Sequence, residues 1–130
     1  MSSEHLTDIE FFQPERMKKS PFAEVVRVEN ILYLSGQLGL THTGKLAPGG
    51  IAEETRQALE NIKTTLERYG SSLNHVVKVT VMLADIGEWS TMNKIYMGYF
   101  PDHYPARSAF GTTGLAMGAQ VEIECIAVLK

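Results

Sequence analysis

The chain has 130 residues, which fits one domain and leaves little room for a second. Its residues are 44% hydrophobic and 21% charged, a composition that excludes a disordered chain. The formal net charge is −3 and the basic residues are scattered, which argues against a nucleic-acid-binding surface.

The cysteine content and the hydropathy pattern indicate a cellular compartment. A single cysteine, Cys125, excludes an internal disulfide, and its strand-like setting VEIECIAVL predicts a buried, structural thiol. The sequence has no secretory signal pattern, and no apolar run approaches the roughly 18 residues of a membrane span. We therefore expect a soluble, cytoplasmic protein with no membrane contact.

The N-terminal part of the chain predicts a hairpin that follows an irregular segment. Residues 1–20 are polar and aperiodic, and we expect them to lie over the surface or over a neighbouring subunit. Two apolar runs, Val25 to Val28 and Ile31 to Ser35, then predict two strands. The break at Glu29 and Asn30 favours a hairpin, and THTGKLAPGG predicts a loop.

A helix and a strand are predicted in the middle of the chain. From Ile51 to Tyr69 apolar residues recur at helical spacing with charged residues mostly opposite, and Gly70 is placed to end the helix. The segment HVVKVTVMLAD alternates, which predicts a strand. Its expected buried face is formed by Val77, Val79, Val81 and Leu83.

A second helix and two strands complete the chain. The helix is predicted from about Glu88 to Phe100, and Pro101 ends it. Its expected apolar face is formed by Trp89, Met92, Tyr96 and Phe100. The strands are predicted over Ala106 to Gly111 and Val121 to Leu129, separated by the glycine-rich GTTGLAMG.

This order of elements predicts an α+β fold with both helices on one face of a mostly antiparallel sheet. No further element remains to cover the other face of the sheet. We therefore expect another subunit to cover it.

Two glutamates near the C-terminus form a candidate site. On a strand, Glu122 and Glu124 share one face with Ile126 and Val128, while the opposite face is apolar. A face that changes from charged to apolar along its length favours an interface or a cleft. The alternative is a pair of solvated glutamates on an edge strand.

A lone arginine, Arg107, precedes the strand in YPARSAFG. If the two terminal strands pair, Arg107 and Glu122 could share a cleft in which the guanidinium binds an organic carboxylate through two parallel N–H···O bonds. Alternatively, Arg107 pairs with Glu122 or Glu124. The residue types leave both interpretations open.

The histidines and the helix asparagine carry weaker signals. His5, His42, His75 and His103 have no spacing typical of a metal site, and no second cysteine is available, so no metal is expected. Asn93, next to the apolar face of the second helix, is either a half-exposed polar residue or part of a site.

Four segments resemble the RidA/YjgF family of reactive-intermediate imine deaminases, which is also named for L-PSP endoribonuclease and translation inhibition. The segments are YLSGQLGL, VVKVTVMLADIGEWSTMNKIY, PARSAF and VEIECIAV. They follow one another in order between Pro21 and Val128, nearly the whole chain. The combination is specific, whereas any one segment alone is weak.

This resemblance implies a chorismate-mutase-like α+β fold over residues 1–130, with 1–20 as a polar N-terminal segment. It also implies a homotrimer with ligand clefts between subunits. The implied activity is hydrolysis of 2-iminobutanoate, 2-iminopropanoate and the corresponding enamines to 2-keto acids and ammonia. The expected partners are small 2-imino and 2-keto carboxylates, and no metal or organic cofactor is expected.

The resemblance assigns roles to residues by position. Arg107 matches the arginine that binds the substrate carboxylate, and Glu122 matches the glutamate that orients or activates the attacking water. Gly36, which follows Ser35, matches a backbone position lining the pocket, and Asn93 matches an asparagine that borders it.

Three further positions carry variations within the family. Trp89 falls where another bulky aromatic usually contacts the ligand, and Ala109 falls where some members carry a cysteine. Phe22, in SPF, stands where deaminating members have the tyrosine of a G-P-Y pattern. We expect Phe22 to fill the same aromatic position beside the substrate without the hydroxyl.

Two other functions stay open from the sequence. A non-catalytic, trimeric binder of small carboxylates would use the same residues but would leave the lifetime of an imine unchanged. A ribonuclease is disfavoured by the acidic charge balance and by the lack of a histidine pair or a basic stacking platform.

Overall fold

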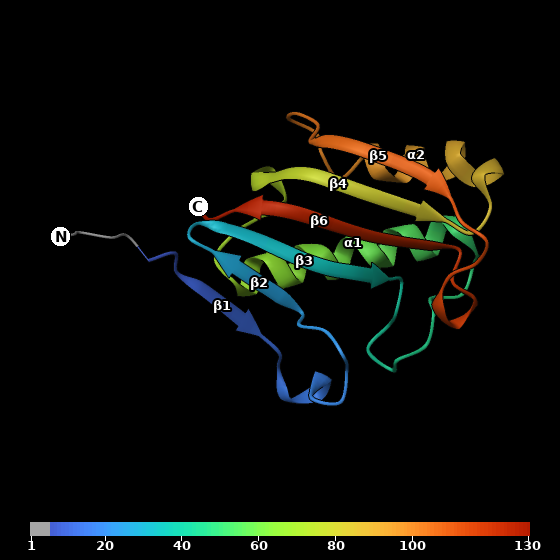
Figure 1. The fold of residues 1–130 in the computed structure, drawn as a ribbon. Coiled ribbons are helices and arrows are strands. Elements are labelled where there is room, and N and C mark those ends of the chain that lie inside the picture. Colours follow the sequence, from blue (N-terminus) through green and yellow to red (C-terminus); the bar gives the residue numbers. More distant parts are fainter. Residues whose placement is uncertain (1–5) are drawn as a thin grey trace.

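The structure, a computed structural model, describes residues 6–130 and shows one mixed sheet with two α-helices (Figure 1). The strands are β1 Ile9–Phe12, β2 Val25–Val28, β3 Ile31–Leu38, β4 Val76–Leu83, β5 Ala106–Gly111 and β6 Val121–Val128. Their order across the sheet is β1-β2-β3-β6-β4-β5. The helices are α1 Ile51–Arg68 and α2 Trp89–Met97. Short 3₁₀ turns lie at Glu15–Met17, Leu73–His75, Ile86–Glu88 and Ala116–Gly118.

Both α-helices cover the same face of the sheet, which confirms the predicted α+β class (Figure 1). The hydrophobic core lies between the helices and the sheet, and residues of α1, α2, β2, β3, β4 and β6 form it. On β6 it is formed by Val121, Ile123, Cys125 and Ala127, as the alternation predicted. Cys125 is free and buried, and burial raises the pKa of its thiol to about 12, so it packs as a small apolar group.

Helix α1 follows the predicted boundaries closely. Its buried positions recur every three to four residues, and Ala58, Ile62 and Leu66 are almost fully buried. Gly70 lies just beyond the helix with φ +88, a left-handed conformation that favours glycine. Among residues 6–130, no helix combines the length and the apolarity that crossing a membrane needs.

Two details of the predicted central elements are wrong. The second helix ends at Met97 rather than at Phe100, although Phe100 is still buried in the core. Val77 is 47% exposed because the register of β4 against β6 shifts between Val76 and Lys78, and Val76 is buried in its place. Such an irregularity changes which residues of the strand point to each face of the sheet. The prediction assumed that the residues alternate strictly, so it could not include this change.

The prediction of an irregular N-terminal segment is wrong in part. β1 forms within it and pairs antiparallel with β2, while residues 1–5 lie outside the described part of the chain. Phe12 packs on Tyr69 with ring centroids 4.8 Å apart. The Arg27 guanidinium donates to Glu10 at 2.6 Å and to Asp8 at 2.8 Å. The sequence pattern did not predict β1, because ion pairs of Asp8 and Glu10 with Arg27 of β2 contribute to holding it.

The last two strands do not pair with each other, contrary to the arrangement considered from the sequence. β5 runs parallel to β4, and β6 lies between β3 and β4. Arg107 is in register with the core residue Val79, whereas Glu122 is in register with Met82 and alternates with core residues. Because paired residues share a face, Arg107 lies on the helix face of the sheet and Glu122 on the opposite face.

Candidate active site

Arg107 lies on β5 with its side chain against α2. Its Nη1 donates a hydrogen bond of 2.8 Å to Oδ1 of Asn93. The guanidinium carbon lies 4.6 Å from the ring centroid of Tyr96 and 5.5 Å from that of Trp89, which favours cation–π attraction. Within residues 6–130 no carboxylate forms a hydrogen bond or ion pair with Arg107. Within one chain, Arg107 therefore does not pair with Glu122 or Glu124.

A cavity of about 270 Å³ lies beside this guanidinium. It is lined by Asn93, Tyr96, Met97, Tyr104, Pro105 and Arg107. The Tyr96 hydroxyl is buried without a hydrogen-bond partner in the described part of the chain. Burial raises the pKa of Tyr96 to about 12, against a smaller opposing effect of Arg107, so the ring stays neutral at physiological pH.

This arrangement can bind a carboxylate. One donor of Arg107 is used by Asn93, and that bond fixes the plane of the guanidinium while its remaining donors stay available. The flanking rings supply an apolar surface that lowers the local dielectric constant and strengthens a charge-assisted bond. A small anion with a short apolar side chain suits both features.

A second group of predicted residues gathers around Glu122. The register of β3 against β6 shifts between Leu34 and Gln37, so that Ser35 and Gly36 form a bulge in β3. The Glu122 carboxylate lies directly over Gly36, because a Cβ placed on this glycine would come within 2.0 Å of Oε2. The absence of a side chain at Gly36 is therefore what gives this carboxylate its space.

The electrostatics of Glu122 suit proton transfer. Burial raises the pKa of this carboxyl above its usual value, and the neighbouring Glu124 carboxylate raises it further. A carboxylate that is partly desolvated and has a raised pKa is a better proton acceptor near neutral pH. The two glutamates share the face that the sequence pattern predicted, with Glu122 half-buried and Glu124 exposed.

Ser35 and Phe22 lie in the segments next to this carboxylate. The Ser35 hydroxyl donates to the Ala23 carbonyl oxygen at 2.6 Å, and its backbone N–H donates to the Glu24 carbonyl oxygen at 3.1 Å. These bonds fix the chain that carries Phe22, whose side chain is 51% exposed. The hydroxyl of Ser35 is thus occupied in holding the backbone.

The eight residues that the sequence singled out thus fall into two groups on opposite faces of the sheet. Arg107, Asn93 and Trp89 form one group, and Glu122, Gly36 and Ser35 form the core of the other. Phe22 precedes Ala23, whose carbonyl oxygen accepts from the Ser35 hydroxyl, while Ala109 is in register with Val81 and packs against the core. Two residues that line the cavity were not predicted as site residues: Tyr96 was assigned to the core alone, and Tyr104 was not considered. The signal for Tyr104 was its position directly before the P-A-R segment.

Metal chemistry has no candidate ligands here. Residues 6–130 contain no group of three or more His, Cys, Asp and Glu side chains that could hold a metal ion.

We predict that Gly36→Ala folds but lowers activity. The clashing atom is the far end of the flexible Glu122 side chain, so the carboxylate can move away at small cost to the fold. Displacing the Glu122 carboxylate by about 1 Å is expected to lower kcat about tenfold or more. Thermal unfolding and kcat check the two halves of this prediction, and unchanged kcat would show that the carboxylate position is irrelevant.

Comparison with known proteins identifies the family. The family model described as Endoribonuclease L-PSP matches residues 14–129. A 2-iminobutanoate/2-iminopropanoate deaminase of Bos taurus is 48% identical over 109 residues, which cover 83% of this chain and 80% of the relative. A Yersinia pestis structure of the conserved Rid protein family, YyfA, superposes with a TM-score of 0.87 at 33% identity and covers 94% of this chain and 100% of its own.

A further solved structure has a ligand in its description. It is the structure of E. coli TdcF with bound serine, which has a TM-score of 0.80 at 30% identity and covers 85% of this chain and 90% of its own. The matched family model spans residues 14–129, and the Bos taurus relative aligns over 109 residues of the chain. The chain belongs to the RidA/YjgF family, whose model carries the name Endoribonuclease L-PSP.

Proposed function

We propose that this protein is a 2-iminobutanoate/2-iminopropanoate deaminase that acts without a metal or organic cofactor. The observation that carries the proposal is the Arg107 guanidinium, held by Asn93 and two aromatic rings beside a cavity and lacking a carboxylate partner within residues 6–130. The Bos taurus and Homo sapiens relatives, 48% and 42% identical, carry this enzyme name.

In this mechanism the substrate carboxylate binds Arg107, which places the imine carbon at a fixed distance from the guanidinium. Two parallel N–H···O bonds to the carboxylate set its orientation, each worth about 1.5–3 kcal/mol. Trp89 and the other apolar walls contact the short alkyl group of the substrate. Fixing the electrophile in this way removes much of the entropic barrier to attack by water.

Glu122 then acts on the water. Its carboxylate accepts a proton as the water oxygen bonds to the imine carbon, which gives a tetrahedral carbinolamine. The same carboxyl returns this proton to nitrogen, which completes the neutral carbinolamine, and then moves the carbinolamine hydroxyl proton to nitrogen. The C–N bond breaks, and ammonia leaves as the C=O bond of the 2-keto acid forms. One water is consumed, no electron is transferred, and Glu122 ends in its starting state.

The site requires two protomers in this proposal. Arg107 and Glu122 lie on opposite faces of one sheet, so one chain cannot direct both at a single substrate. We propose that the Arg107 group of one protomer meets the Phe22, Ser35, Gly36 and Glu122 group of its neighbour in a homotrimer. The neighbour then also covers the sheet face that the helices leave open.

The test of the function is imine hydrolysis by the purified protein. Freshly generated 2-iminobutanoate and 2-iminopropanoate should decay faster in its presence, with matching release of ammonia and 2-keto acid. A protein that binds 2-oxobutanoate but does not shorten the lifetime of either imine would instead be the non-catalytic carboxylate binder. The proposed location is cytoplasmic, which the lone buried Cys125 supports because it needs no oxidising compartment.

We predict a stable trimer in solution. The sheet face opposite the helices carries Phe11, Tyr33 and Phe110, which are 73%, 43% and 46% exposed. Apolar groups on such a face favour burial against another subunit. Light scattering at micromolar concentration should give three times the 14.4 kDa mass of the chain. A monomeric mass together with full activity would rule out the shared site.

A further inference from the structure

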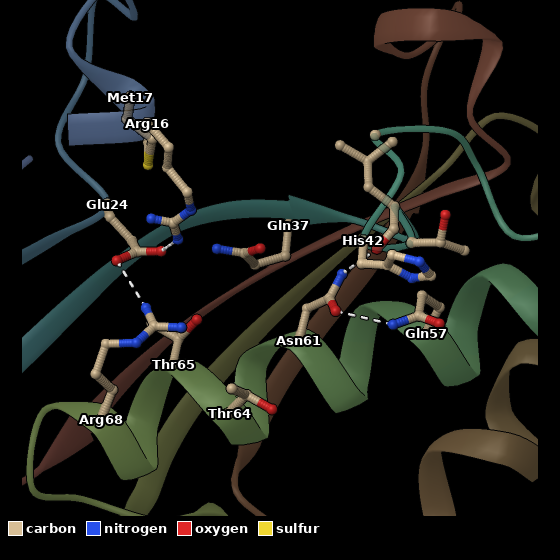
Figure 2. A pocket seen from close by; sticks show the side chains of 13 residues that line it. Arg16, Met17, Glu24, Gln37, His42, Gln57, Asn61, Thr64, Thr65 and Arg68 are labelled. Carbon is tan, nitrogen blue, oxygen red and sulfur yellow. Dashed lines mark hydrogen bonds and ion pairs between the residues drawn. The ribbon is translucent and has the colours of Figure 1, made fainter. Parts of the chain in front are cut away.

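A second cavity, of about 960 Å³, lies on the helix side of the sheet, away from Arg107 (Figure 2). It opens between α1, the end of β3 with the loop that follows, and the Glu15–Met17 turn. Its polar lining includes Arg16, Gln37, His42, Asn61, Thr64 and Arg68. None of the eight residues predicted for the active site lines it.

One wall of this cavity is built around a buried carboxylate. Glu24 is 2% exposed, and its Oε1 accepts hydrogen bonds from Arg68 Nη1 at 3.1 Å and from the Tyr69 hydroxyl at 3.0 Å. Its Oε2 accepts from Arg16 Nη2. A buried carboxylate needs such partners, and here it fixes two arginines from distant parts of the chain at one end of the cavity.

The two arginines carry more charge than Glu24 neutralises. Glu24 is the sole acidic residue among the described residues that line the cavity, so this end has a net charge of +1. Each guanidinium gives one hydrogen bond to Glu24, and the Arg16 and Arg68 side chains remain 55% and 46% exposed. Several N–H donors of each are therefore left for a ligand.

Neutral polar groups extend the cavity away from the arginines. The Gln37 side chain lies between Glu24 and His42 in Figure 2, and within residues 6–130 it has no hydrogen-bond partner. Asn61, by contrast, is occupied: it donates to the Leu38 and Leu40 carbonyl oxygens at 3.3 and 2.9 Å. Asn61 thus holds the loop that forms the wall, while Gln37 is available to a ligand.

From these contacts we propose that the cavity binds a small organic anion. Its carboxylate or phosphate group lies between Arg16 and Arg68, and its polar body reaches Gln37. The site is separate from both parts of the proposed active site: the cavity shares no lining residue with the one beside Arg107, and Gln37, in register with the core residue Ile123, lies on the face opposite Glu122. The cavity is also more than three times larger than the one beside Arg107.

Calorimetric titration of the 130-residue protein carrying Arg107→Ala tests this proposal with inorganic phosphate and with succinate as probes, because this change removes the carboxylate-binding group of the proposed active site. We expect saturable binding that Arg68→Ala weakens about tenfold or more, because charge-assisted bonds are lost. Arg56→Ala is the matched control, since Arg56 lies on the same helix, pairs with Glu53 at 3.5 Å and does not line the cavity. The stronger of the two probes identifies a phosphate or a carboxylate ligand.

A second variant covers the case in which Arg68→Ala disturbs the fold. Thr64 is exposed, lines the cavity and lies one turn before Arg68 on α1, so Thr64→Phe should place a ring beside this guanidinium and weaken binding about tenfold or more while both arginines stay on Glu24. The wild type should bind the probes at this cavity and, in addition, bind succinate at Arg107. No binding in the Arg107→Ala background, or binding there that Thr64→Phe leaves unchanged, would overturn the proposal, and neither outcome depends on imine hydrolysis.

Discussion

Arg107→Lys is expected to lower kcat/KM for 2-iminobutanoate by about ten- to a hundredfold while the fold survives. Lysine keeps the positive charge but loses the planar fork, and with it one of two charge-assisted bonds worth about 1.5–3 kcal/mol each. The variant also loses the planar guanidinium, whose carbon lies 4.6 Å from the Tyr96 ring centroid, and the hydrogen bond of 2.8 Å to Asn93. Steady-state kinetics with both imines measure the effect.

The control for this variant is Arg27→Lys at the other end of the sheet. Arg27 is likewise a partly buried strand arginine, but its guanidinium donates to Asp8 and Glu10 of the same chain. This change should lower stability and leave kcat/KM unchanged. Near-normal turnover by Arg107→Lys would show that Arg107 serves the structure alone, and equal losses in both variants would indicate a general effect on folding.

Local pattern was enough to predict much of this fold. The apolar spacing of α1 and the strict alternation of β6 each follow from burial of one face, so both could be located from the sequence alone. The sequence predicts only two helices, which can cover one face of the sheet, so an uncovered second face could also be predicted. These features depend on residues close together in the chain, where the sequence pattern reports directly on the environment.

Pairing between distant strands was beyond that reasoning. The parallel pairing of β5 with β4 brings Arg107 next to α2, and nothing in YPARSAFG states which neighbour its strand will take. The bulge at Ser35 and Gly36 likewise depends on the register against β6, so the contact between Gly36 and Glu122 was invisible in the sequence. The resemblance to a family selected these residues, but their division between two faces emerged only from the topology.

Glu122→Gln is expected to lower kcat by about a hundredfold or more and to leave carboxylate binding nearly unchanged. An amide cannot accept the proton of the attacking water, whereas Arg107 lies on the other face of the sheet and keeps its contacts. Glu124→Gln is the matched control because Glu124 lies two residues along the same strand and is exposed. Equal losses of kcat in the two variants would indicate that the glutamates act as a structural pair.

The pH dependence gives an independent test of the same role. Burial and the Glu124 carboxylate both raise the pKa of Glu122, so its basic form is lost as the pH falls through a value above 4.5. In the wild type, kcat/KM should therefore fall on the acidic side of its pH profile at a pH above 4.5. Glu124→Gln removes one cause of the raised pKa and should move this limb to lower pH.

The same raised pKa predicts a cost to stability. Because the folded state holds the Glu122 proton more tightly than the unfolded state, folding is favoured as the pH falls from above the raised pKa towards the ordinary value of 4.5. At pH 7 the ionised carboxylate therefore destabilises the fold, and Glu122→Gln should unfold at a higher temperature than the wild type. This difference in unfolding temperature between the two proteins should disappear below pH 4.5, where Glu122 is protonated in both the folded and the unfolded state. Thermal unfolding across this range checks the sign, and a less stable Glu122→Gln at pH 7 would mean that the carboxylate serves the fold rather than the reaction.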